Sequence, residues 1–80
     1  METSKAMKDK NLNIKSKGIY FILYTMLLNN EDINRDVLVE YSGLGKQTLG
    51  NCIRELKEKG YLEIIKTNIN GKFVHEYKLK

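Results

Sequence analysis

The hydrophobic pattern of this chain changes period once, at Gly60, and that change constrains the fold more than any other feature. Before Gly60, apolar residues recur with the 3.6-residue period of amphipathic helices. After it, Tyr61 to Thr67 predicts one strand, and Phe73 to Leu79, in which apolar and charged residues alternate, predicts a second. The Asn70-Gly71 dipeptide between them is the strongest short-range indication of a hairpin turn. The pattern therefore predicts an α+β protein with its helices first and a β-hairpin last.

Three helices are predicted ahead of the hairpin. Asn13 and Asn34 are suited to cap the first two, because a short polar side chain there can accept from a free amide of the first turn. Gly43 allows a tight turn after the second helix, and Gly60 terminates the third. The predicted bounds are Asn13–Leu28, Asn34–Tyr41 and Lys46–Lys59.

The 80 residues, 41% hydrophobic and 30% charged, suffice for one small domain, which we assign to residues 12–80. Residues 1–11 are polar and lysine-rich with no apolar period, which predicts a flexible N-terminal arm. The sequence shows no secretory signal and no apolar stretch of about 20 residues, so we expect neither secretion nor membrane insertion. One cysteine cannot form an internal disulfide, which favours a cytoplasmic location.

The net charge of +4 is unevenly distributed. Residues 1–17 carry five lysines against two acids, residues 18–44 carry one arginine against four acids, and residues 45–80 carry eight bases against four acids. The molecule is therefore expected to be polarised, with basic parts that permit an anionic partner without requiring one.

The third predicted helix has two different faces. An apolar stripe of the width expected for a core-facing surface holds Leu49, Cys52, Ile53 and Leu56. The opposite side carries amide and guanidinium groups of the kind that hydrogen-bond base edges, on Gln47, Asn51 and Arg54. Lys46 and Thr48 flank them at the helix start, where backbone amides and the helix dipole favour a phosphate. An ordinary solvated helix face would have a similar composition. The interpretation of this face therefore depends on the helix and the turn that precede it in the chain.

A short helix, a glycine-containing turn and an amphipathic helix form a helix-turn-helix, whose second helix enters the major groove of DNA. Residues 34–62 resemble this part of winged-helix DNA-binding proteins, above all in GLGKQTLGNCIRELKEKGYL (43–62). LNIKSKGIYFILY (12–24) and NGKFVHEYKL (70–79) resemble the winged-helix domain of phage and plasmid replication initiators and related regulators. The resemblance covers residues 12–79 and implies a winged helix: a three-helix helix-turn-helix core followed by a C-terminal β-hairpin wing.

The resemblance places recognition helix 46–59 in the major groove and wing 66–73 on the DNA backbone. The residues expected to face bases are Gln47, Asn51 and Arg54, and those expected to touch phosphates are Lys46, Thr48, Lys66 and Lys72. Two positions depart from the family pattern. Gly45 replaces the usual Ser or Thr cap, and Asn51 stands where relatives often have Arg, which shifts readout from guanine towards adenine.

The first predicted helix is apolar on two sides. Ile19, Ile22 and Met26 form one face, and Tyr20, Tyr24 and Leu27 form a second. Either the helical core and the hairpin cover both faces, or the second face is an exposed patch that serves as a partner or homodimer surface.

The sequence thus predicts a small protein that binds double-stranded DNA, a transcriptional regulator or replication-control protein of a phage, plasmid or low-GC bacterium. The alternative is a protein–protein interaction module that keeps the winged-helix shape, such as a phage protein that engages or inhibits a host machine. We expect no enzymatic activity and no cofactor or metal, because the single histidine, His75, has no ligand-type residues at suitable spacing. Cys52 lies on the edge of the apolar stripe and is expected to serve packing.

Overall fold

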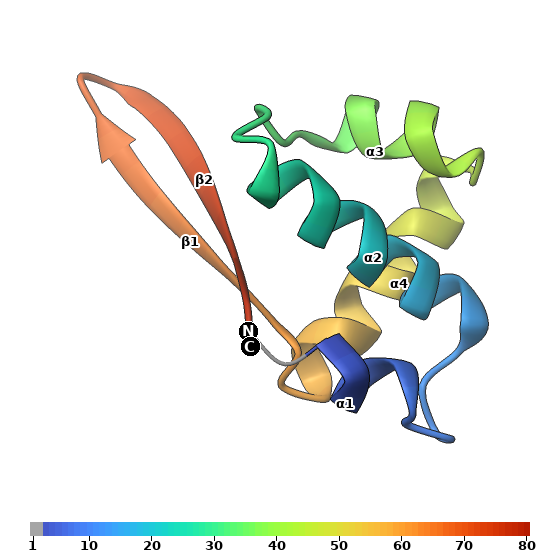
Figure 1. The fold of residues 1–80 in the computed structure, drawn as a ribbon. Helices are drawn as coiled ribbons and strands as arrows, with labels where there is room; N and C mark the ends of the chain where they lie inside the picture. Colours follow the sequence, from blue (N-terminus) through green and yellow to red (C-terminus); the bar gives the residue numbers. More distant parts are fainter. Residues whose placement is uncertain (1–2) are drawn as a thin grey trace.

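The computed structural model describes residues 3–80 and shows an α+β protein in which four helices precede a two-stranded antiparallel hairpin (Figure 1). The elements are α1 (Thr3–Met7), α2 (Ile14–Leu28), α3 (Arg35–Ser42), α4 (Lys46–Glu58), β1 (Leu62–Ile69) and β2 (Lys72–Leu79). In Figure 1, α2 crosses in front of α4, α3 lies above them, and α1 lies below. The predicted order of helices followed by a hairpin is confirmed.

Side-chain caps fix the starts of two helices where the sequence predicted them. The Asn13 side chain accepts a hydrogen bond from the Lys15 amide at 2.8 Å, and the Asn34 side chain accepts one from the Val37 amide at 2.9 Å. Each bond satisfies an amide that has no partner within its own helix, which is worth about 1 kcal/mol. After α3, Gly43 adopts a left-handed φ of 72° and turns the chain towards α4.

The hairpin turn also has the geometry predicted from its sequence. Asn70 and Gly71 both have positive φ, 52° and 80°, as a two-residue turn of type I′ requires. The register runs from Ile69 opposite Lys72 to Leu62 opposite Leu79, so both strands extend closer to the turn than the sequence indicated.

Residues 3–11 are folded where the sequence predicted a flexible arm. They include α1, in which Ala6 is fully buried. The Tyr61 hydroxyl donates a hydrogen bond of 2.7 Å to the Asp9 carboxylate, which ties this segment to the chain just before β1. The prediction of an arm is therefore wrong for residues 3–11, because one buried alanine among charged residues leaves no apolar period. Residues 1 and 2 lie outside the described part of the chain.

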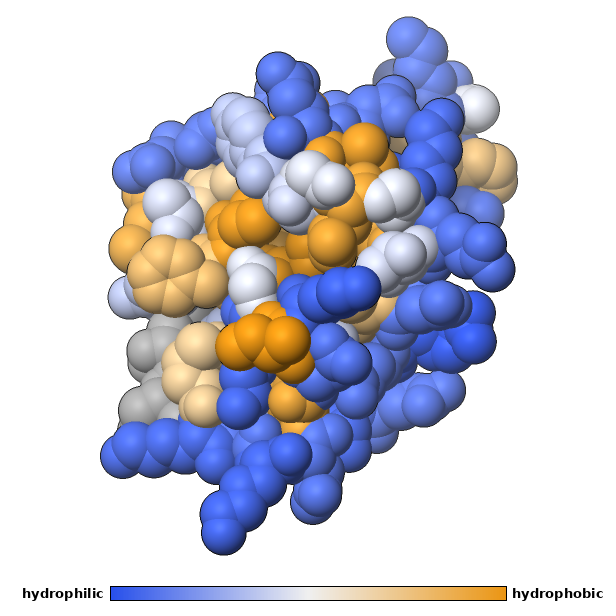
Figure 2. All heavy atoms as spheres, turned by 90° about the vertical axis from the view of Figure 1, so that its right-hand side faces the viewer, coloured by the Kyte–Doolittle hydropathy of each residue, from blue (hydrophilic) through white to orange (hydrophobic). Residues whose placement is uncertain are grey.

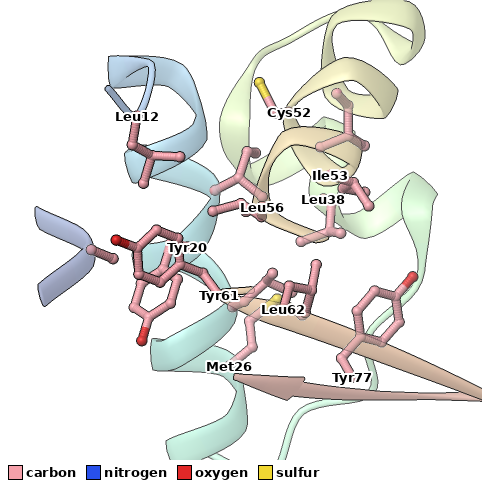
Figure 3. Packing of buried hydrophobic residues seen from close by; sticks show 14 residues of the cluster. Leu12, Tyr20, Met26, Leu38, Cys52, Ile53, Leu56, Tyr61, Leu62 and Tyr77 are labelled. Atoms are coloured by element: carbon pink, nitrogen blue, oxygen red, sulfur yellow. The ribbon is translucent and has the colours of Figure 1, made fainter. Parts of the chain in front are cut away.

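The core lies between α2, α4 and the base of the hairpin (Figure 3). The stripe predicted on α4 is buried throughout, with at most 5% exposure for Leu49, Cys52, Ile53 and Leu56. The fully buried apolar residues of α2 are Ile19, Tyr20, Leu23 and Met26. Burying one such aliphatic side chain stabilises the fold by about 1.5 to 3 kcal/mol, so this packing fixes which side of α4 faces outward.

Tyr20 belongs to the core and not to a partner surface. Its side chain is 0% exposed, its ring meets the Tyr61 ring edge-on with centroids 6.2 Å apart, and its hydroxyl donates to the Lys80 carbonyl at 3.4 Å. Tyr24 and Leu27 are half-buried. The partner surface proposed for Tyr20, Tyr24 and Leu27 is therefore wrong for Tyr20, because Tyr61, just before β1, and Lys80, just after β2, contact that side of α2.

Candidate nucleic-acid interface

The exposed face of α4 brings together the three residues expected to face bases. Gln47, Asn51 and Arg54 are all exposed, opposite the buried stripe of the same helix. The Arg54 guanidinium donates to the Asn51 side-chain oxygen at 3.4 Å, which is long for a hydrogen bond. All three side chains are therefore accessible to a ligand.

The start of α4 offers backbone amides as well as a cation. Gly45 precedes the helix in an extended conformation and has no side chain to cap it, so no cap side chain occupies the amides of the first turn. Lys46 is exposed there and Thr48 is half-buried. Free amides, the positive end of the helix dipole and a lysine together favour an anion at this end.

A third cation reaches α4 from α3. A Cβ atom built on Gly50 would meet the Arg35 guanidinium at 3.6 Å, so the arginine side chain extends over α4 at that position. Arg35 was not among the predicted site residues, because in the sequence it stands in the acidic middle segment. Only the packing of α3 against α4 places this positive charge close to the exposed face.

A cavity of about 480 Å³ separates the exposed face of α4 from the start of α2. Lys15 and Arg54 contribute positive charge to its wall, and Glu55 and Glu58 contribute negative charge. Because the acids lie in the C-terminal half of α4, a polyanion is favoured at the N-terminal half of the helix. Sequence reasoning missed Lys15, since nothing local indicates that the start of α2 lies beside α4.

Glu55 has a structural role beside this cavity. Its carboxylate accepts hydrogen bonds from the Ser16 hydroxyl and, at 3.3 Å, from the Asn13 backbone amide. Ser16 is 1% exposed, so its hydroxyl depends on this acceptor. The three residues fasten the start of α2 to α4 directly behind the candidate interface.

The hairpin lysines form a second, separate group. Lys66 and Lys72 are both exposed, and the Lys66 ammonium lies 4.2 Å from the centre of the Phe73 ring, a cation–π contact. The tip of the hairpin projects away from the helices, on the opposite side of the molecule from the turn between α3 and α4 (Figure 1). The structure therefore does not bring the hairpin lysines into contact with Lys46.

The described residues contain no cluster of three or more His, Cys, Asp or Glu side chains that could hold a metal ion. His75 is exposed on β2, and Cys52 is a buried free thiol, as its place in the apolar stripe predicted. In residues 3–80 no helix has both the length and the hydropathy needed to cross a membrane.

Comparison with known proteins yields no protein-family model that matches this chain, and no similar curated protein or solved structure.

Proposed function

We propose that this chain is a winged-helix protein that binds double-stranded DNA through α4 and acts in transcriptional regulation or replication control. The observation that carries the proposal is the division of α4 into two faces. One face is buried as a continuous apolar stripe, and the other exposes Gln47, Asn51 and Arg54. An α-helix with its side chains is about 10 to 12 Å wide, which fits the major groove.

In this proposal, the side chains on the exposed face of α4 contact the bases. The amide groups of Gln47 and Asn51 are suited to adenine, which offers one donor and one acceptor in the major groove. The Arg54 guanidinium is suited to guanine, which offers two acceptors. Each bidentate contact of this kind is worth about 1 to 3 kcal/mol of discrimination against a wrong base.

The groups around this face contact the phosphates. Lys46, Thr48 and the free amides of the first turn hold one strand at the start of α4, and Arg35 adds charge from α3. Lys66 and Lys72 on the hairpin engage the backbone at a distance from α4. Because these contacts release counterions, the affinity for DNA falls steeply as the salt concentration rises.

A duplex titration at two salt concentrations, followed by fluorescence anisotropy, tests the proposal. We expect binding at low salt and a linear fall of log K with log salt. Charge reversal of both Lys46 and Lys72 should reduce that slope by about 0.9 for each phosphate that the variant no longer neutralises. Lys5→Glu is the matched control, because Lys5 lies on α1, away from both cationic groups (Figure 1). Absence of binding at low salt, or an equal loss of affinity in the control, would contradict the proposal.

A second candidate function, a protein–protein interaction module, is favoured by the apolar end of the hairpin. Phe73, Ile69 and Val74 are 62%, 53% and 48% exposed there. A cavity of about 400 Å³ separates this part of β2 from residues 32–35, which include Asp32. If the apolar end of the hairpin binds a protein partner, Phe73→Ser should abolish the effect of this protein in cells. Lys46→Glu should leave that effect intact. The DNA-binding proposal predicts the opposite ranking of the two variants.

A further inference from the structure

The outward side of α2 carries a line of exposed apolar side chains. Ile14, Phe21 and Leu28 are 77%, 56% and 64% exposed and follow one another at intervals of seven residues. Because seven residues make almost two helical turns, the three lie on one line about 21 Å long, which we call the α2 stripe.

The described part of the chain leaves the α2 stripe uncovered. In Figure 1, the other side of α2 packs on α4, while no element lies in front of α2. Large exposed apolar side chains gathered on one face usually mark an interaction surface. A partner that covers this face must be elongated and apolar along its length, as another helix is.

We propose that the α2 stripe pairs with the α2 stripe of a second copy of this chain, with the two helices antiparallel about a two-fold axis at Phe21. In this arrangement Phe21 meets Phe21 of the second copy, and Ile14 meets Leu28 of the second copy. The contact is isologous, so one surface serves both chains.

Charges at the two ends of α2 favour the antiparallel pairing. Lys15 and Lys17 lie in the first turns of the helix, and Glu31 and Asp32 follow its C-terminal end. Antiparallel packing sets the lysines of one copy near the acids of the other at both ends, and it opposes the two helix dipoles. Parallel packing would place like charges together.

Gly18 provides an independent argument for the same partner. It is exposed inside α2, where glycine costs about 1 kcal/mol relative to alanine, and a Cβ atom built on it would meet no atom within 4 Å. The fold of one copy therefore does not require glycine at this position. With a two-fold axis at Phe21, Gly18 lies on one flank of the paired surface, where the missing side chain lets the two helices approach closely.

A shallow cavity lies beside Gly18 on the same flank of α2. It measures about 260 Å³, separates α2 from the turn between α3 and α4, and is lined in part by Gly18, Ile22 and Leu44. Figure 2 shows this side of the molecule, with hydrophobic residues gathered in the middle and hydrophilic residues around them. On the other flank, Tyr24 is half-buried and its ring centroid lies 6.3 Å from that of Phe21, so the two aromatic side chains extend the apolar surface around the two-fold axis.

The inference does not depend on DNA binding, because the α2 stripe contains no residue of α4. It is tested by the mass in solution of the full chain without DNA, measured by sedimentation equilibrium over roughly a hundredfold range of concentration. The mass should rise from 9.3 kDa towards twice that value. Phe21→Glu and Phe21→Lys should each raise the dissociation constant more than about tenfold, since like charges then face each other across the axis.

An equimolar mixture of the Phe21→Glu and Phe21→Lys chains should associate again, because opposite charges then meet at the axis. Phe73→Glu is the matched control, because Phe73 is a phenylalanine on the hairpin that is 62% exposed against 56% for Phe21, and this variant should dimerise like the natural chain. Leu28→Glu should weaken the dimer in the same way as Phe21→Glu. Circular dichroism checks that each variant is folded.

Three results would overturn the proposal. The first is a monomer mass for the natural chain at every concentration. The second is a mixture of folded Phe21→Glu and Phe21→Lys chains that stays monomeric. The third is a dimer that Phe73→Glu abolishes and Phe21→Glu leaves intact, which would place the contact on the hairpin.

Discussion

Replacing Glu55 with alanine is expected to loosen α2 from α4 and to destabilise the whole fold. The carboxylate is the acceptor for the buried Ser16 hydroxyl and for the amide of Asn13, the residue that caps α2. Shortening the side chain to a methyl group removes this acceptor from both donors. The substitution therefore weakens the contact that positions the exposed face of α4.

The expected cost follows from these contacts. A hydrogen bond to a charged group contributes about 1.5 to 3 kcal/mol, and a carboxylate near a helix N-terminus adds about 0.3 to 1 kcal/mol. The Asn13 amide is exposed and regains water, so its bond adds little. Glu55→Ala should thus lower the free energy of unfolding by about 2 to 3 kcal/mol, and the melting temperature of a domain this small by about 10 to 20 °C.

Urea unfolding of the natural chain, Glu55→Ala and Glu58→Ala measures this effect. Glu58 is the matched control, because it is an exposed glutamate in the same helix and should change stability by less than about 0.5 kcal/mol. In a chain that already carries Ser16→Ala, Glu55→Ala should lower the free energy of unfolding by less than it does in the natural chain, since the two residues act through one hydrogen bond. Equal unfolding free energies for Glu55→Ala and Glu58→Ala would refute the reasoning.

Three further predictions concern stability. Gly50→Ala should raise the free energy of unfolding by about 1 kcal/mol, because a methyl group there makes only an ordinary contact with Arg35; a lower melting temperature would contradict the packing described. Gly71→Ala should lower it by about 1 to 2 kcal/mol, because the turn requires a φ of 80°, and an unchanged urea midpoint would show that the turn has another geometry. Hydrogen bonds from the Tyr61 hydroxyl and then the Asn11 amide hold the pKa of Asp9 below its usual 3.8. This stabilisation is complete above pH 3.8 and disappears as the pH falls through the lowered pKa, so urea midpoints should fall more steeply in acid for the natural chain than for Asp9→Asn.

Local chemistry accounts for the parts of the fold that could be predicted. Asn13 and Asn34 cap helices through bonds that reach only two or three residues along the chain. The turn at Asn70-Gly71 likewise depends on the backbone freedom of two residues. The apolar stripe of α4 was also predictable, because a helix with one strongly polar side has a single way to face a core.

The parts that could not be predicted depend on contacts between distant residues. The segment that includes α1 is held by Asp9 and Tyr61, which are 52 residues apart, and no sequence period marks that contact. The orientation of the α2 side chains could not be predicted for a different reason. Because the helix carries apolar residues on more than one side, its sequence did not indicate that Tyr20 turns inward and Phe21 outward.

The candidate interface likewise contains residues that the sequence predicted and residues that it did not. Gln47, Asn51 and Arg54 follow from the phase of one helix, and they are exposed as that phase requires. Arg35 and Lys15 reach the surroundings of α4 from other helices, and only the tertiary packing places them there.

Backbone amide NMR shifts of the isotopically labelled chain, recorded while duplex DNA is added at low salt, report which residues contact DNA. DNA binding through α4 predicts the largest shift changes in residues 46–54, and smaller ones at the hairpin turn near Lys72. Changes confined to the α2 stripe or to the apolar end of the hairpin around Phe73, with residues 46–54 unmoved, would contradict it.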